Sequence, residues 1–205
     1  MTDDEVRTAT VTDLDAIVSA LTDAFADDPL MRWAFAANVR RQRLAALWRF
    51  IAAEGYLPRG TSTVVPVADA AALWLAPGEV LGDEFWQARG EQFASALEGD
   101  VERLSAIGEA MSVHHPREQH HWYLLAIGVA TTRQGTGLGS ALLTHTLAKA
   151  DEDGAPAYLE ATSLRSRVLY ERHGFEVTAE LVVDDSPPLW PMWRESTRDQ
   201  RSRRF

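Results

Sequence analysis

Three glycines at alternating positions mark the segment with the clearest chemistry. An apolar run from Leu124 to Val129 leads through a short polar turn into Gly135, Gly137 and Gly139, and a helical pattern follows. Because glycine has no Cβ, successive backbone N–H groups can converge on an anion, and the positive end of the helix dipole adds to the attraction. The segment therefore predicts a loop that binds the pyrophosphate of a cofactor.

The spacing of this loop excludes two common nucleotide-binding motifs. No Lys follows the glycines, so the loop is not a P-loop that handles a γ-phosphate. The dinucleotide fingerprint requires a third glycine three positions after the second, whereas position 140 is Ser. Glu160, about twenty residues further on, is weak support for that fingerprint by itself.

A second motif lies about thirty residues after the loop, where Tyr170 is followed by three residues and then by Gly174 and Phe175. With the Gln-x-x-Gly-x-Gly pattern that begins at Gln134, it resembles the GNAT superfamily of N-acetyltransferases, which bind acetyl-CoA at this loop. Within the superfamily, the pattern is most similar to the puromycin N-acetyltransferase group. Seven segments match in order: 24–29 (AFADDP), 74–77 (WLAP), 115–118 (HPRE), 121–124 (HWYL), 134–139 (QGTGLG), 158–160 (YLE) and 170–175 (YERHGF).

The resemblance implies an α/β (α+β) fold, in which a mixed central sheet of about six to seven strands is flanked by helices and splays beside the glycine loop. The pantetheine arm of acetyl-CoA is then expected in the gap, bonded to the backbone of Ile127, Gly128 and Val129 in the manner of an added strand. Ser166 stands where many members carry an Asn that bonds the pantetheine. The remaining expected cofactor contacts are Arg133, Gln134, Gly135, Thr136, Gly137, Leu138, Gly139, Ser140 and Tyr170.

Acetyl transfer from a thioester to an amine needs a neutral amine, stabilisation of an oxyanion and a proton for the departing thiolate. Tyr170 matches the superfamily tyrosine that is usually assigned as the general acid, and the backbone N–H of Val129 is the first candidate for the oxyanion. The base stays open: His121 and Glu160 are candidates, and deprotonation through water is the alternative. The chain has no Cys, so transfer is direct or passes through another side chain.

Aromatic residues in the variable segments suggest how the acceptor is recognised. We expect Phe25, Trp33, Tyr123 and Trp190 to line an aromatic cleft for a small, partly apolar amine, such as the antibiotic puromycin. Two other functions stay open, namely acetylation of a protein or peptide amine and a CoA-binding sensor without turnover.

Composition restricts the partners of the chain. At 205 residues and 46% hydrophobic residues, a single domain over residues 1–197 is expected, with a disordered basic tail over 198–205. The net charge of −10 argues against nucleic acid, and a homodimer stays open. No apolar run approaches a membrane span and the N-terminus is acidic, which predicts a cytoplasmic protein without a membrane partner. No metal is expected, because no Cys or carboxylate cluster completes a set of ligands.

Apolar periodicity and turn residues predict the order of the elements. Strict alternation along 121–129 places His121, Tyr123, Leu125, Ile127 and Val129 on one face of a strand. Strands are expected at 6–10, 61–66, 71–76, 121–129, 157–161, 176–183 and 189–194. Helices are expected from Thr12 or Asp13 to 25, then at 31–54, 83–111 (split near Gly99), 137–153 and 164–173.

Overall fold

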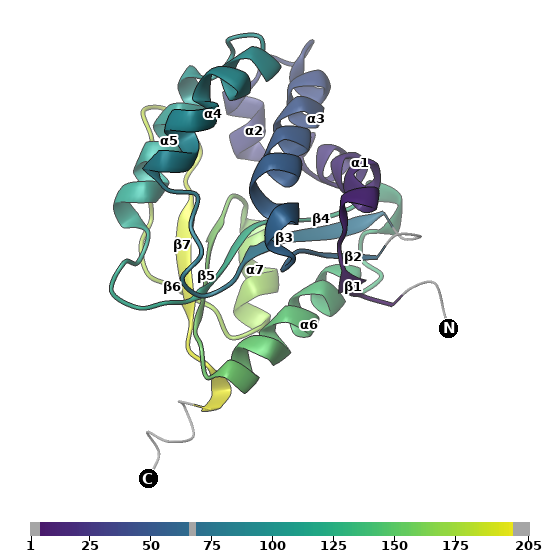
Figure 1. Cartoon of the computed structure of the whole chain (residues 1–205), viewed down its shortest axis with the longest axis vertical. Coiled ribbons are helices and arrows are strands. Elements are labelled where there is room, and N and C mark those ends of the chain that lie inside the picture. Colours follow the sequence, from purple (N-terminus) through teal and green to yellow (C-terminus); the bar gives the residue numbers. More distant parts are fainter. Residues whose placement is uncertain (1–4, 66–68, 199–205) are drawn as a thin grey trace.

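The computed structural model describes residues 5–65 and 69–198 and contains one mixed sheet, which confirms the predicted fold class (Figure 1). Its seven strands lie in the order β1-β2-β3-β4-β5-β7-β6, and only β4 and β5 pair in parallel. The strands are β1 (Arg7–Thr8), β2 (Thr63–Val65), β3 (Ala70–Leu75), β4 (Trp122–Val129), β5 (Ala157–Ala161), β6 (Glu176–Val177) and β7 (Trp190–Arg194).

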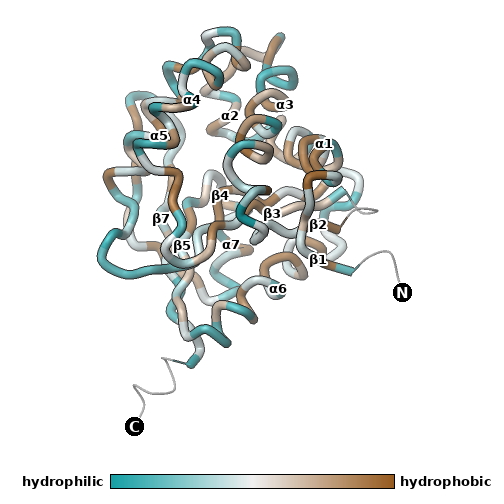
Figure 2. Tube along the Cα trace, viewed as in Figure 1, coloured by the Kyte–Doolittle hydropathy of each residue, from teal (hydrophilic) through white to brown (hydrophobic). Residues whose placement is uncertain are grey.

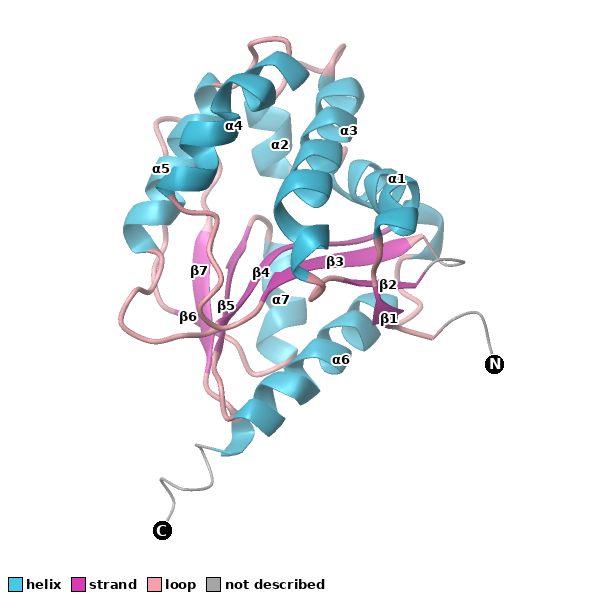
Figure 3. Cartoon of the chain, viewed as in Figure 1, coloured by secondary structure: helices cyan, strands magenta, loops and turns pink. Residues whose placement is uncertain are grey.

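Helices cover both faces of the sheet (Figure 3). In the view shown, α1 to α5 lie above the strands, and α6 and α7 lie below them. The α-helices are α1 (Leu14–Phe25), α2 (Pro29–Ala34), α3 (Arg40–Phe50), α4 (Asp83–Ala96), α5 (Glu102–His114), α6 (Leu138–Asp153) and α7 (Leu164–Arg172). The parallel pair and its crossover helix α6 form the predicted central βαβ unit.

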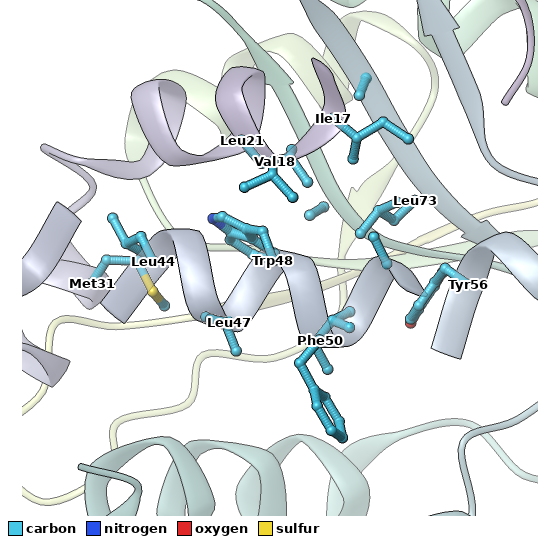
Figure 4. Close-up of a cluster of buried hydrophobic side chains, with 14 of the residues drawn as sticks. Ile17, Val18, Leu21, Met31, Leu44, Leu47, Trp48, Phe50, Tyr56 and Leu73 are labelled. Carbon is cyan, nitrogen blue, oxygen red and sulfur yellow. The ribbon is translucent and has the colours of Figure 1, made fainter. Parts of the chain in front are cut away.

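Each face has its own hydrophobic core, and hydrophobic residues gather on β3 and β4 between the two (Figure 2). The upper core packs α1 and α3 against β3, with Leu21, Trp48 and Leu73 among its buried side chains (Figure 4). The lower core packs α6 and α7 against the strands and includes Leu143 and Trp74. The upper face is therefore built by helices from the first half of the chain and the lower face by helices from the second half.

The predicted helix over 31–54 was wrong, because the segment folds as α2 and α3 with a break between them. The Asp28 side chain caps α2 by accepting hydrogen bonds from the backbone N–H of Leu30 (2.9 Å) and Met31 (3.2 Å). After α3 the chain continues as a π-helical turn, Ile51–Tyr56, and such turns are frequent at functional sites. This turn brings the Tyr56 side chain into the upper core, in the same cluster as Leu73 of β3 (Figure 4).

Other element boundaries also differ from the sequence-based expectation. The first helix is preceded by a 3-10 turn, Val11–Asp13, whose N-cap is Thr10, and Asp13 is the N-cap of α1 without a side-chain cap hydrogen bond. The strand expected over 176–183 ends at Val177, and only an isolated bridge between Leu181 and Leu189 follows. Position 66 of the expected second strand lies outside the described residues. So does the expected tail from 199 onward, while the Arg198 guanidinium donates to the carbonyl of Glu152 (3.3 Å).

A β-bulge in β4 overturns the predicted strict alternation. Leu73 pairs with Ala126 and Trp74 with Leu124, so Leu125 is an extra residue in β4. Tyr123, before the bulge, packs on the upper core, whereas Ile127 and Val129, after it, pack on the lower core. The pattern of apolar residues contains no signal for this shift, because residues on both sides of the bulge are apolar.

No helix in the described part of the chain is long and apolar enough to cross a membrane.

Candidate active site

The sheet opens between β4 and β5. Their parallel register runs from Trp122–Ala157 to Leu124–Leu159 and stops there, although β4 continues to Val129. On its other side β4 stays paired with β3 as far as Val129. Residues 125–129 therefore form a strand edge that β5 does not pair with. This edge borders the gap that the resemblance predicted for the pantetheine.

The glycine loop follows this edge and has the backbone shape of an anion-binding loop. Gly135 and Gly137 have φ values of +80° and +92°, a left-handed conformation that favours glycine, and a Cβ on either would meet no atom within 4 Å. Gly137 is the N-cap of α6, and no side chain caps this helix end. The open loop and the uncapped N-terminus of a sixteen-residue helix fit a pyrophosphate group.

The polar side chains of the loop bond the protein itself. The Thr136 hydroxyl donates to the carbonyl of Arg133 (2.7 Å), and Ser140 Oγ is hydrogen-bonded to His173 Nε2 (2.7 Å). Gln134 donates from Nε2 to the carbonyl of Val129 (3.2 Å). These contacts hold the loop in shape, so the backbone N–H groups are the donors that face an incoming phosphate.

Three further expected cofactor residues have a structural task in the fold. Ser166 forms a capping box with Ser163 at the start of α7, through contacts of 2.9 to 3.3 Å, so its hydroxyl serves the helix end.

Gly128 lets α1 approach β4 closely, because a Cβ there would lie 2.9 Å from Leu21 Cδ2 and from Ala24 Cβ. Gly139 similarly admits Leu169, since its Cβ would lie 3.4 Å from that side chain. Leu138 packs against the lower core, and Arg133 is exposed beside the loop.

Tyr170 projects from α7 into the lower core and is 6% exposed. Burial raises the pKa of its phenol well above the usual value, and the charge of Asp28 raises this pKa further. The hydroxyl therefore keeps its proton, as a hydrogen-bond or proton donor must.

Asp28 is the carboxylate at this end of the gap, and the sequence analysis did not single it out. Besides capping α2, its Oδ2 accepts a hydrogen bond from the Thr162 hydroxyl (2.6 Å) just beyond the end of β5. Burial raises the pKa of Asp28. An Asp-Pro pair at a helix start is a common cap, so no signal in the sequence separates this residue from an ordinary cap.

Glu160 lies on the opposite face of β5 from the lower core and is 7% exposed. Its Oε2 accepts a hydrogen bond from the Tyr123 hydroxyl (3.0 Å), while Oε1 is buried without a hydrogen-bond partner. Burial raises the pKa of Glu160 to about 7, against the opposing effects of Tyr123 and Tyr158. No hydrogen bond of standard geometry joins Tyr158 to Glu160, and the Tyr158 hydroxyl is likewise buried without a partner.

His121 lies immediately before β4 and is buried. Its Nδ1 is hydrogen-bonded to the carbonyl of Gln119 (2.8 Å), which makes Nδ1 the donor, and its Nε2 lies 3.1 Å from His115 Nε2. Burial lowers the pKa of both rings, that of His115 to about 4. The pair is therefore uncharged at neutral pH, and the His115 ring packs against the rings of Tyr123 and Tyr158.

The four expected acceptor residues do not share one environment. Tyr123 adjoins Glu160, and Phe25 packs on Trp48 in the upper core at a ring distance of 4.9 Å. Trp33 is half-buried and donates from Nε1 to Asp185 (2.8 Å), with the Arg103 guanidinium 4.8 Å from its ring. Trp190 is only 7% exposed and belongs to the lower core with Tyr170.

Comparison with known proteins agrees with this geometry. Residues 67–175 match the family model described as the acetyltransferase (GNAT) family. The chain is 26% identical over 201 residues to an uncharacterized N-acetyltransferase of Schizosaccharomyces pombe, an alignment that covers 90% of this chain and 80% of that protein.

Solved structures extend the likeness to the whole fold. A Corynebacterium glutamicum protein described as histone acetyltransferase HPA2 and related acetyltransferase is 31% identical, with a TM-score of 0.72 over 94% of this chain and 96% of that one. A polyamine N-acetyltransferase of Drosophila melanogaster is 18% identical, with a TM-score of 0.63 over 93% and 98%, and shows likeness of fold alone. The family match spans more than half of the sequence and includes the β4 edge, the glycine loop and Tyr170. The chain belongs to the GNAT family of acetyltransferases and is an acyltransferase.

Proposed function

We propose that this protein transfers the acetyl group of acetyl-CoA directly to the amine of a small, partly apolar molecule. The observation that carries the proposal is the unpaired β4 edge, which leads directly into an uncapped, glycine-lined helix N-terminus. Backbone groups of Ile127, Gly128 and Val129 would hold the pantetheine, and the N–H groups of residues 135–140 would hold the phosphates. Bound acetyl-CoA supplies the acetyl thioester.

The side chains around the gap have distinct tasks in this proposal. Tyr170 donates its proton, or a hydrogen bond, to the departing sulfur, because its phenol stays protonated at neutral pH. The charge of Asp28 raises the pKa of Tyr170, in addition to the effect of burial. Asp28 also attracts the ammonium form of the acceptor to that end of the gap. The carboxylate of Glu160 orients the acceptor by attracting the positive charge of the acceptor. His121 and His115 support the phenols beside Glu160.

The choice of a small molecule rests on the acceptor side of the sheet. The carboxylates and tyrosines that face the gap are half-buried or buried, and a deep site suits a compact amine better than an extended peptide. The solved relatives named for polyamine and arylalkylamine acetylation agree with small amines as acceptors. Puromycin is one candidate acceptor among amines with an aromatic body.

Thiol release with acetyl-CoA and a panel of amines tests the proposal. We expect Tyr170→Phe to lower kcat by roughly 10²-fold, because the ring remains and the donor is lost, while the affinity for CoA changes little. An unchanged kcat would make Tyr170 a packing residue. A protein that binds acetyl-CoA but acetylates none of the amines, proteins or peptides tested would instead be the non-catalytic sensor.

A further inference from the structure

The face of β5 that looks toward α1 and α3 carries a buried carboxylate enclosed by phenols. Glu160 accepts a hydrogen bond from Tyr123, and its charge also raises the pKa of Tyr56 and Tyr158. The rings of Tyr123 and Tyr158 are stacked, with centroids 6.0 Å apart. Aromatic faces beside a carboxylate are the arrangement that proteins use to bind an ammonium or guanidinium group.

Two polar atoms in this enclosure have no partner of their own. Glu160 Oε1 and the Tyr158 hydroxyl are both buried and make no hydrogen bond. A buried carboxylate oxygen without a partner is costly, and a cation that donates hydrogen bonds would satisfy it. Tyr158 also lines an open pocket of about 480 Å³, together with His114, Arg117 and Trp193.

The enclosure is separate from the reacting end of the gap. Asp28 acts on Tyr170 and is bonded to Thr162, two positions beyond Glu160 along β5. At about 3.3 Å per residue, the Cα atoms of Glu160 and Thr162 are about 7 Å apart, and the Asp28 carboxylate lies beyond Thr162. An amine that reacts beside Tyr170 therefore leaves Glu160 available for a second charge on the same molecule.

We infer that the acceptor carries two cationic groups, one at the reacting nitrogen and one bound by Glu160 beside the rings of Tyr123 and Tyr158. This inference rests on the proposed function and narrows its acceptor to alkyl or arylalkyl diamines and to amines that bear a guanidinium group. The apolar part of the acceptor then lies along the tyrosine rings between the two charges.

Calorimetric titration at pH 8, with CoA present, tests the subsite directly with 1,5-diaminopentane and with 1-aminopentane, which has the same chain and one charge. We expect the diamine to bind the parent protein at least about tenfold more tightly, with this preference lost in Glu160→Gln and kept in Glu176→Gln, an exposed carboxylate on β6. Equal affinities for the two amines in the parent, or an unchanged preference in Glu160→Gln, would overturn the inference.

Thiol release with the same amines separates this inference from the proposed function. A kcat/KM that is higher for the diamine and falls toward the value for the monoamine in Glu160→Gln supports both. Turnover of both amines at equal kcat/KM overturns the two-charge inference, while the proposed acetyltransferase function stands. Calorimetric discrimination without turnover of any amine keeps the subsite and defeats the proposed reaction.

Discussion

The two faces of the sheet meet at one gap, yet they are built in different ways. On the lower face, the edge of β4, the glycine loop, α6 and Tyr170 come from one continuous stretch of about fifty residues. On the upper face, Glu160 gathers Tyr56, Tyr123 and Tyr158 from segments spread over a hundred positions. In the proposed function, the lower face contacts acetyl-CoA through backbone groups, and the upper face contacts the acceptor through side chains. Many sequences can form the same backbone shape, so binding through backbone groups tolerates substitutions. Binding through side chains is different, because a single substitution can change which ligand is bound.

The largest expected effect would show whether Trp190 belongs to the lower core or to an acceptor site. Trp190→Ala removes an indole that is 7% exposed, so we expect it to lower the free energy of unfolding by about 3 to 5 kcal/mol. Trp33→Ala, at a half-buried position held by Asp185, should cost clearly less. Urea denaturation measures both, and equal losses would contradict the assignment of Trp190 to the core.

The next effect is the loss of folding stability that the buried carboxylate of Glu160 causes on the upper face. Burial raises the pKa of Glu160 from 4.5 to about 7, so between these pH values the unfolded chain releases a proton that the folded protein retains. The free energy of unfolding therefore falls as the pH rises through this window, by about 3 kcal/mol. We expect Glu160→Gln to stabilise the protein at pH 8 and to have no such effect at pH 4. A stability difference between parent and variant that does not change with pH would show that Glu160 titrates normally.

A change in the glycine loop tests the lower face alone. Gly137 has φ +92°, which a β-branched residue does not adopt without strain, so Gly137→Val should distort the loop. A hundredfold excess of acetyl-CoA over its Kd adds about 2.7 kcal/mol to the parent, and this stabilisation should vanish in the variant. Thermal melts with and without acetyl-CoA give the result, and Gly99→Val, at a left-handed glycine far from the loop, is a matched control. A full shift in Gly137→Val would remove the loop from the cofactor site.

The smallest expected effect separates a packing glycine from a cofactor contact. A Cβ at Gly128 would lie 2.9 Å from both Leu21 and Ala24, so Gly128→Ala should cost about 1 to 2 kcal/mol through displacement of α1. Because the backbone groups of β4 remain, the Kd for CoA should change by less than about threefold. A large loss of CoA affinity with unchanged stability would show that Gly128 serves the ligand instead of the helix.

How far the sequence alone leads also differs between the faces. The glycine spacing and Tyr170 predicted the lower face because both depend on local backbone geometry and on a motif of fixed spacing. Strand β5 was predicted with its exact bounds, since its five residues are bounded by clear turn residues. On the upper face, Glu160 and Tyr123 were expected as site residues, but the residues that surround them could not be predicted in this way. Three features depend on which distant segments pack together, and no local pattern encodes that choice. They are the burial of Glu160, the contact of Asp28 with Thr162 and the burial of Trp190.

The extra residue in β4 has a practical consequence for protein engineering. Leu125 reverses the alternation of β4, so odd-numbered residues pack on the upper core before it and on the lower core after it. A design that exchanges residues of β4 must therefore be aligned separately on each side of Leu125. Because Leu124 and Ala126 pair with consecutive residues of β3, deletion of Leu125 would leave a regular ladder in which both halves keep their present faces.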